Sequence, residues 1–242
     1  MSRTSGYYEV REALGQPGCA LCRLEAAAAE RFLDGLLYTQ VNDPALRDGI
    51  RRARGFCPEH TWQLVRPGAS LGVAIVTNDV LSALLKVLES GEFEALPRLS
   101  VRRVQEALDR EQPAAATAGL VAELGPQAAC PACQHVASMR QVYVDTLLEQ
   151  LLGGGALLPH VEASDGLCLP HLRLTLARVG DREVFEALLG AQRAIWQGLV
   201  EDLREFIRKT DYRFRDEGRG AEGDAWLRAV AALGGSRPET KR

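Results

Sequence analysis

The sequence predicts an all-α protein, a helical bundle built from two related halves. Apolar residues recur at helical spacing along most of the chain, and no stretch shows the alternation of a half-buried strand. In addition, a cysteine–histidine pattern occurs twice, with every member of the second copy 111 positions after its counterpart. The two copies are Cys19, Cys22, Cys57 and His60, and Cys130, Cys133, Cys168 and His171. A repeat at a fixed offset predicts a shared fold for the two halves.

The first half is expected to span residues 1–112. An amphipathic helix is predicted over 20–40, and Asn-Asp-Pro at 42–44 ends it and starts a shorter helix to about Arg54. Cys57-Pro58 is typical of a cap and first turn, so the next helix runs to about Val65. Ser70 is predicted to cap a longer apolar helix, and 99–110 forms a further short one.

Residues 113–129 are rich in Ala, Gly and Pro, which predicts a linker. The second half then covers 130–210, with a long helix from Pro131, a short one from Leu169 and the longest from Arg182. The wide apolar stripe of this last helix predicts burial by several neighbours. Residues 211–242 form a C-terminal extension with one short helix over 225–233.

Three thiols and one imidazole are what a closed tetrahedral zinc site needs. Residues i and i+3 in a first helical turn point the same way, so each Cys-x-x-Cys or Cys-x-x-His pair can bind one ion together. We expect each half to be stapled by its own Cys₃His site, and therefore two zinc ions per chain. Four protein ligands leave no open position for a catalytic water, which argues against an enzyme and favours an interaction or scaffold module.

Two alternatives use the same residues. A Cys₃His set can also hold an iron–sulfur cluster. Oxidation of a Cys-x-x-Cys pair could release zinc and make the protein a redox-responsive thiol switch. Within the second set, His135 or His160 could replace His171 as a ligand.

The composition and net charge limit the cellular location and the classes of partner that we expect. The net charge is −3 and the pI is about 5.9, so there is no electrostatic reason to expect nucleic-acid binding. No apolar signal segment follows Met1 and no stretch resembles a membrane span, so we expect a cytoplasmic protein without membrane contact. A reducing compartment leaves the thiols free for metal. A protein partner is expected; its identity and the oligomeric state cannot be read from the sequence.

The motif Cys19-Ala-Leu-Cys22-Arg-Leu-Glu, followed by Gly55-Phe56-Cys57-Pro58-Glu59-His60 and Leu71-Gly72-Val73-Ala74, resembles a prokaryotic family, domain of unknown function 6062. The second set of ligands fits the tandem layout of that family. The resemblance brings no assigned reaction. It implies that Asp211, Tyr212 and Arg213 have a role, which we expect to be hydrogen bonding that docks the C-terminal helix.

Overall fold

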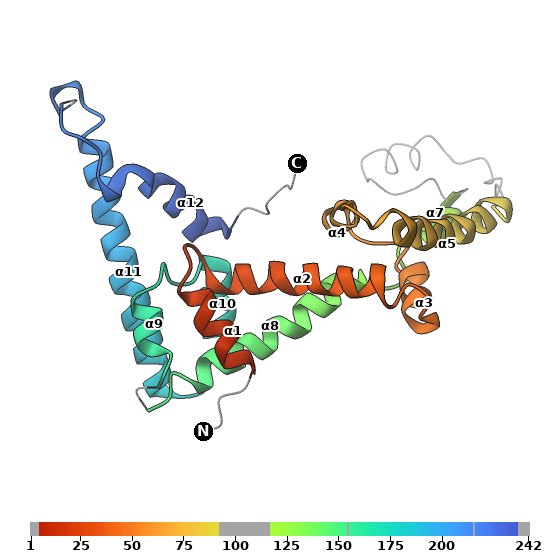
Figure 1. Ribbon diagram of the computed structural model, residues 1–242, viewed down its shortest axis with the longest axis horizontal. Coiled ribbons are helices and arrows are strands. Elements are labelled where there is room, and N and C mark those ends of the chain that lie inside the picture. Colours follow the sequence, from red (N-terminus) through yellow and green to blue (C-terminus); the bar gives the residue numbers. More distant parts are fainter. Residues whose placement is uncertain (1–4, 92–116, 154, 215, 237–242) are drawn as a thin grey trace, which may run out of the picture. The chain divides into compact units, whose positions relative to one another are not determined.

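The computed structural model describes residues 5–91, 117–153, 155–214 and 216–236 (Figure 1). Every regular element in these ranges is a helix, which confirms the all-α prediction. The helices up to residue 91 are α1 (Ser5–Leu14), α2 (Ala20–Tyr38), α3 (Pro44–Arg52), α4 (Pro58–Gln63) and α5 (Ser70–Glu89).

The remaining helices are α7 (Ala118–Leu124), α8 (Pro131–Glu149), α9 (Leu158–Glu162), α10 (Leu169–Leu176), α11 (Arg182–Arg208) and α12 (Ala225–Gly234), with 3₁₀ turns η2 (Tyr212–Phe214) and η3 (Ala221–Asp224). The bounds of α8 are those of α2 moved by 111 positions. Helix α7 lies inside the predicted linker, so that segment is not simply a connection. The predicted helix over 99–110 falls outside the described residues.

Local sequence explains several helix starts. The Asp43 side chain accepts a hydrogen bond from the Leu46 N–H at 2.8 Å, and Pro44 occupies the first position of α3, where no donor is lost. Cys57 and Cys168 are the extended N-cap residues of α4 and α10, each followed by a first turn that contains proline. Ser70 is not the cap that we predicted, since α5 begins at Ser70 itself and Ala69 precedes it.

The chain forms two compact units whose boundaries differ from those of the predicted halves. Unit 1 combines Met1–Ala28 with Val136–Arg242, and unit 2 is Ala29–His135. Helices α2 and α8 each contribute residues to both units. Each unit therefore draws on both copies of the repeat, whereas the sequence predicted one unit per copy.

Unit 1 has a core formed by α1, the start of α2, most of α8, and α9 to α11. Its largest fully buried side chains include Tyr143, Leu21, Leu147 and Leu188. Only the first half of α11 is buried here: Val184 is 3% exposed, whereas Ile207 is 68% exposed. The prediction that neighbours bury the whole stripe of α11 is therefore wrong for its last turns, which extend beyond the core.

Unit 2 has a smaller core in which Leu33, Leu36 and Ile50 are fully buried. Helix α5 is attached to α3 by charge as well as by packing. Asp79 in the middle of α5 accepts hydrogen bonds from Arg47 and Arg51, at 3.1 and 2.8 Å. Burial alone would raise the pKa of Asp79, but the hydrogen bonds and the positive charges of Arg47 and Arg51 together lower it.

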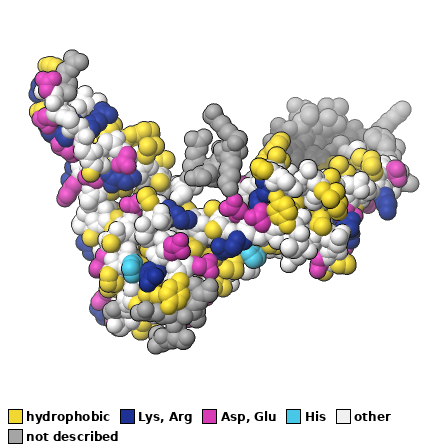
Figure 2. Space-filling model, in the orientation of Figure 1, with side chains coloured by type: hydrophobic (Ala, Val, Ile, Leu, Met, Phe, Trp, Pro, Cys, Tyr) yellow, Lys and Arg dark blue, Asp and Glu magenta, His cyan; other side chains and the backbone are white. Residues whose placement is uncertain are grey.

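Helix α5 is an exception to the expectation that no segment resembles a membrane span. Among the described residues it is long and apolar enough to cross a membrane by length and composition, and only 17% of the apolar window is buried. Figure 2 shows hydrophobic side chains gathered in this part of the molecule, where Leu71, Leu81, Leu85 and Leu88 are exposed. Asp79, in the middle of this helix, forms ion pairs with Arg47 and Arg51 of α3, as is expected of a helix that packs within a folded domain.

We expect Gly72→Ala to destabilise unit 2. Gly72 lies where α5 crosses α2, and a Cβ there would come within 2.6 Å of the Leu37 carbonyl oxygen, a backbone atom that cannot rotate away. The expected loss is about 1–3 kcal/mol in the free energy of unfolding, measured by urea denaturation. Gly35→Ala in α2 is the matched control. No atom lies within 4 Å of its new Cβ, so it should be neutral or slightly stabilising.

Candidate metal centres

All six cysteines and two of the histidines meet in two clusters. Cluster A consists of Cys19, Cys22, Cys168 and His171, and cluster B consists of Cys57, His60, Cys130 and Cys133. In each cluster the four ligand atoms lie within 4.8 Å of one another. These are the eight residues singled out from the sequence, but their pairing was predicted wrongly. Each Cys-x-x-Cys pair meets the Cys-x-x-His pair of the other repeat copy.

The pairing expected within each repeat copy requires the chain to return to Cys19 within the 34 residues before Cys57. Helix α2 carries the chain about 28 Å away over 19 residues, and α3, which follows it, covers only about 14 Å over 9 residues. The chain does not come back within this segment. Cys57 stays in unit 2 with the end of α2, while Cys19 lies in unit 1.

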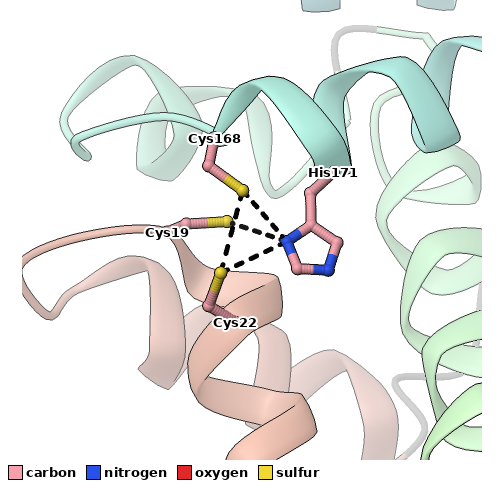
Figure 3. A group of neighbouring side chains, drawn as sticks. All are labelled: Cys19, Cys22, Cys168 and His171. Atoms are coloured by element: carbon pink, nitrogen blue, oxygen red, sulfur yellow. Dashed lines mark hydrogen bonds between the residues drawn. The ribbon is translucent and has the colours of Figure 1, made fainter. Parts of the chain in front are cut away.

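Cluster A lies where the first turns of α2 and α10 meet (Figure 3). The His171 Nδ1 atom faces all three sulfurs, at 3.5 Å from Cys19, 3.3 Å from Cys22 and 3.2 Å from Cys168. The sulfurs of Cys22 and Cys168 are 3.7 Å apart. Cys19 and Cys168 are buried, at 4% and 1% exposure, so this cluster is largely shielded from solvent.

A carboxylate holds the other side of the imidazole. Glu25, one turn after Cys22, approaches His171 Nε2 at 2.8 Å. Arg140 of α8 forms an ion pair with the same carboxylate, with its Nη2 atom 3.1 Å from Glu25 Oε2. Burial alone would raise the pKa of Glu25, but the hydrogen bonds with His171 and Arg140 lower it below its usual value. A charged carboxylate on Nε2 fixes the ring with Nδ1 toward the sulfurs.

The C-terminal segment covers cluster A. The Ser236 backbone N–H donates to the Cys22 sulfur at 3.4 Å. Gly235, with φ +86°, lies so close that a Cβ would come within 3.3 Å of the same sulfur. The residues that follow α12 therefore lie against the Cys22 sulfur, and α12 itself contacts α10 and α11.

Cluster B has the same inner geometry in a more open setting. His60 Nδ1 lies 3.1 Å from Cys57 Sγ, 3.3 Å from Cys133 Sγ and 3.8 Å from Cys130 Sγ, and the sulfurs of Cys57 and Cys133 are 3.6 Å apart. Cys133 is exposed, and Cys57 and Cys130 are half-buried. Among the described residues, no carboxylate holds the outer nitrogen of His60 as Glu25 holds that of His171.

The close packing of the sulfurs and imidazoles shifts the pKa values of both clusters, in different directions. Burial alone would lower the pKa of His171, but hydrogen bonds with Cys19, Cys22 and Glu25 raise it to about 11. The pKa of Cys22 is lowered because Cys168 and Cys19 donate hydrogen bonds to its sulfur. In cluster B, burial lowers the pKa of His60, which favours the neutral imidazole that a metal needs. Desolvation of its sulfur and a hydrogen bond with Cys57 raise the pKa of Cys133 to about 12.

The donor atoms fit a single tetrahedral ion. With Zn–S near 2.3 Å and Zn–N near 2.0 Å, the edges of a tetrahedron are about 3.8 Å between sulfurs and about 3.5 Å between sulfur and nitrogen. One sulfur–sulfur edge is 3.7 Å in cluster A and one is 3.6 Å in cluster B, and the other sulfur pairs lie within 4.8 Å. The sulfur–nitrogen edges run from 3.1 to 3.8 Å. Both clusters could therefore hold a metal ion.

Neither alternative histidine lies in a cluster. His135 stacks on Phe32, with ring centroids 5.0 Å apart, and burial lowers its pKa. His160 is exposed on α9. The expectation that His171 is the histidine ligand of its set is consistent with its place in cluster A.

The segment 211–213 bonds mainly to itself. Arg213 donates to the Asp211 carboxylate through its backbone N–H and its guanidinium, and Tyr212 is 80% exposed. The ion pairs that join α11 to the C-terminal segment come from elsewhere. Lys209 pairs with Glu222 and Arg228 pairs with Asp202, each at 2.8 Å. The docking role expected for 211–213 stays a prediction.

The contribution of Glu25 was missed from the sequence, although a signal was present. Glu25 follows Cys22 by three positions, so on a helix it points along the same face. The residue 111 positions later is Val136. The carboxylate is therefore a point at which the two repeat copies differ.

We expect Glu25→Ala to weaken metal binding at cluster A by about 10- to 100-fold, because the imidazole loses the group that orients it. The measurement is competition with a chromogenic chelator in a Cys57→Ser background, which isolates cluster A. Asp145→Ala is the control, since it removes an exposed carboxylate paired with Arg178 and should leave metal affinity unchanged.

Comparison with known proteins places this chain in a family. The model of a family of unknown function, DUF6062, matches residues 8–240. An uncharacterised 23.9 kDa protein in the xynA 3′ region of Caldicellulosiruptor sp. (strain Rt8B.4) is 39% identical over 80 residues, which cover 33% of this chain and 37% of that protein. The chain thus matches little more than a third of the length of that relative. No solved structure matches.

Proposed function

The chain belongs to the DUF6062 family, and because that family has no assigned function we propose one from the clusters themselves: a zinc-binding helical scaffold. The observation that carries the proposal is the set of donor-atom separations, which in both clusters suits one four-coordinate ion. Each ion would join the first turn of a long helix to a short helix far away in sequence. The 111-residue offset is then most simply explained by internal duplication.

The same separations favour a single ion over an iron–sulfur cluster. In a cluster the protein ligands are distributed over several iron atoms, so their donor atoms need not converge on one point. Here one nitrogen faces three sulfurs at 3.1–3.8 Å in each group. Four protein donors around one ion leave no position for a substrate or a catalytic water, which supports a structural role.

Metal analysis of the purified protein tests this proposal. We expect two zinc per chain and a colourless protein; cobalt in place of zinc should give the visible absorption of tetrahedral thiolate coordination. A brown protein containing iron and sulfide would contradict the zinc assignment. Fewer than two zinc in fully reduced protein would contradict the two-site proposal.

We propose that the scaffold acts by binding another protein, in the cytoplasm, where thiols stay reduced. The exposed leucines of α5 support this, since a row of apolar side chains on one helix suits a protein surface. A reproducible cross-linked partner should be lost in Leu81→Glu/Leu85→Glu and retained in Leu233→Glu, an equally exposed leucine on α12. Binding of the wild type to lipid vesicles instead would argue for a membrane role of α5.

A further inference from the structure

The two clusters share a ligand set but differ in how far solvent can reach them. In cluster A, Cys19 and Cys168 are buried, and Cys22 lies under the backbone of Gly235 and Ser236. In cluster B, Cys133 is exposed and the other two cysteines are half-buried. A small dissolved oxidant can therefore reach a sulfur of cluster B with less rearrangement of the chain.

The clusters also differ in how strongly their ligands are held. His171 is fixed through Nε2 by Glu25, which Arg140 holds in turn. Within the described residues, His60 has no such carboxylate, and no backbone N–H donates to a sulfur of cluster B. Loss of such outer contacts typically weakens metal binding about 10- to 100-fold. Cluster B is therefore both more accessible and less firmly held.

The position of Cys133 favours attack on peroxide by its sulfur. Cys133 is the third residue of α8 and is exposed, whereas Cys57 and Cys130 are half-buried, so a dissolved oxidant reaches its sulfur most easily. A second sulfur, that of Cys57, lies 3.6 Å away, and Cys130 belongs to the same cluster. An oxidised Cys133 thus has a resolving thiolate within reach.

We propose that cluster B is a peroxide-sensitive site, in which Cys133 is oxidised first and closes a disulfide with Cys57 or Cys130 while cluster A stays intact. This inference rests on the proposed function, since it requires both clusters to bind zinc. It assigns oxidation to one of two sites that the sequence pattern alone treats as equal.

The chemistry balances with hydrogen peroxide as the oxidant. The Cys133 thiolate attacks one oxygen of hydrogen peroxide, the O–O bond breaks, and the products are a sulfenic acid, which keeps the proton of that oxygen, and a hydroxide ion. A second thiolate of the cluster attacks the sulfenic sulfur, forms the S–S bond and expels another hydroxide. Two thiolates lose two electrons and peroxide gains two. With two of its four ligands joined as a disulfide, the site no longer binds zinc.

The structural consequence is confined to unit 2. Cluster B attaches α4, through Cys57 and His60, to the start of α8, whose Ala132 belongs to the core of unit 2. Oxidation releases α4 from this attachment. A thiol reductant reverses the step by reducing the disulfide, after which zinc can bind again.

The test begins with protein shown to contain two zinc, treated with increasing peroxide beside a zinc-sensitive dye. We expect one zinc to be released at least about tenfold faster than the other. Differential alkylation and peptide mass spectrometry, sampled after the fast phase, should find Cys133 in a disulfide and Cys19, Cys22 and Cys168 still reduced. Reductant with added zinc should restore the original content.

Removing the cover over cluster A provides the control. A chain ending at Gly234 lacks Gly235 and Ser236, so its slow phase should accelerate while its fast phase stays unchanged. Equal release from both clusters of the wild type, or a first disulfide among the cysteines of cluster A, would overturn the inference and leave the two-zinc scaffold intact. A protein that never held two zinc would overturn the proposed function, and the inference with it.

Discussion

Replacing Cys19 and Cys168 together by serine should remove one of the two metal ions, and replacing Cys19 and Cys57 together should remove both. The first pair belongs to cluster A alone, whereas the second pair damages both clusters. The first variant leaves cluster A two of its four donors, and the second leaves each cluster three, so no affected cluster keeps a closed tetrahedral shell. Elemental analysis of the two double variants, purified under reducing conditions, gives the comparison directly.

If each repeat copy instead bound its own ion, the numbers of ions lost would be reversed. The first variant would lose both ions and the second would lose one. The matched pair in cluster B provides an independent check. Cys57→Ser/Cys130→Ser should retain one ion, and Cys130→Ser/Cys168→Ser should retain none. Equal losses in all four double variants would contradict the pairing in this structure.

The helices could be predicted from the sequence because their signals are local. The apolar period locates α2 and α8, and Pro44, Cys57 and Cys168 mark helix starts through backbone geometry that neighbouring residues determine. The eight ligands were also within reach, since residue type and i, i+3 spacing are local as well. Helix α7 was missed because its Ala- and Gly-rich surroundings resemble those of a linker.

The pairing of the ligands could not be predicted in the same way. Either pairing of the Cys-x-x-Cys and Cys-x-x-His pairs completes two Cys₃His sets, and the sequence offset is equal for both copies. Which two pairs share an ion depends on the long-range contacts between α2 and α8 within each unit. In unit 1, Glu25 of α2 meets Arg140 of α8, and in unit 2, Phe32 meets His135. These contacts join residues more than 100 positions apart, and no local pattern encodes them.

Removing both ions with a strong chelator should unfold unit 2 and loosen unit 1. Structural zinc contributes an apparent ~10–16 kcal/mol in small finger peptides, which matches or exceeds the ~5–15 kcal/mol net stability of a typical domain. Helix α4 has 6 residues and α10 has 8, far below the ~12–15 at which an isolated helix becomes marginally stable in water. Without the ions, these two helices depend on side-chain packing alone.

The two units should respond to different extents, because unit 1 retains the larger core. The buried residues of α8 and α11, among them Tyr143 and Leu188, pack together whether or not cluster A is occupied. Amide hydrogen exchange should therefore rise throughout α4 and α5, while the buried first half of α11 keeps part of its protection. Added zinc should reverse the change, and magnesium, which prefers oxygen ligands, should not. Unchanged exchange in α4 after complete loss of zinc would show that packing alone holds unit 2, and that the metal is not what keeps this short helix in place.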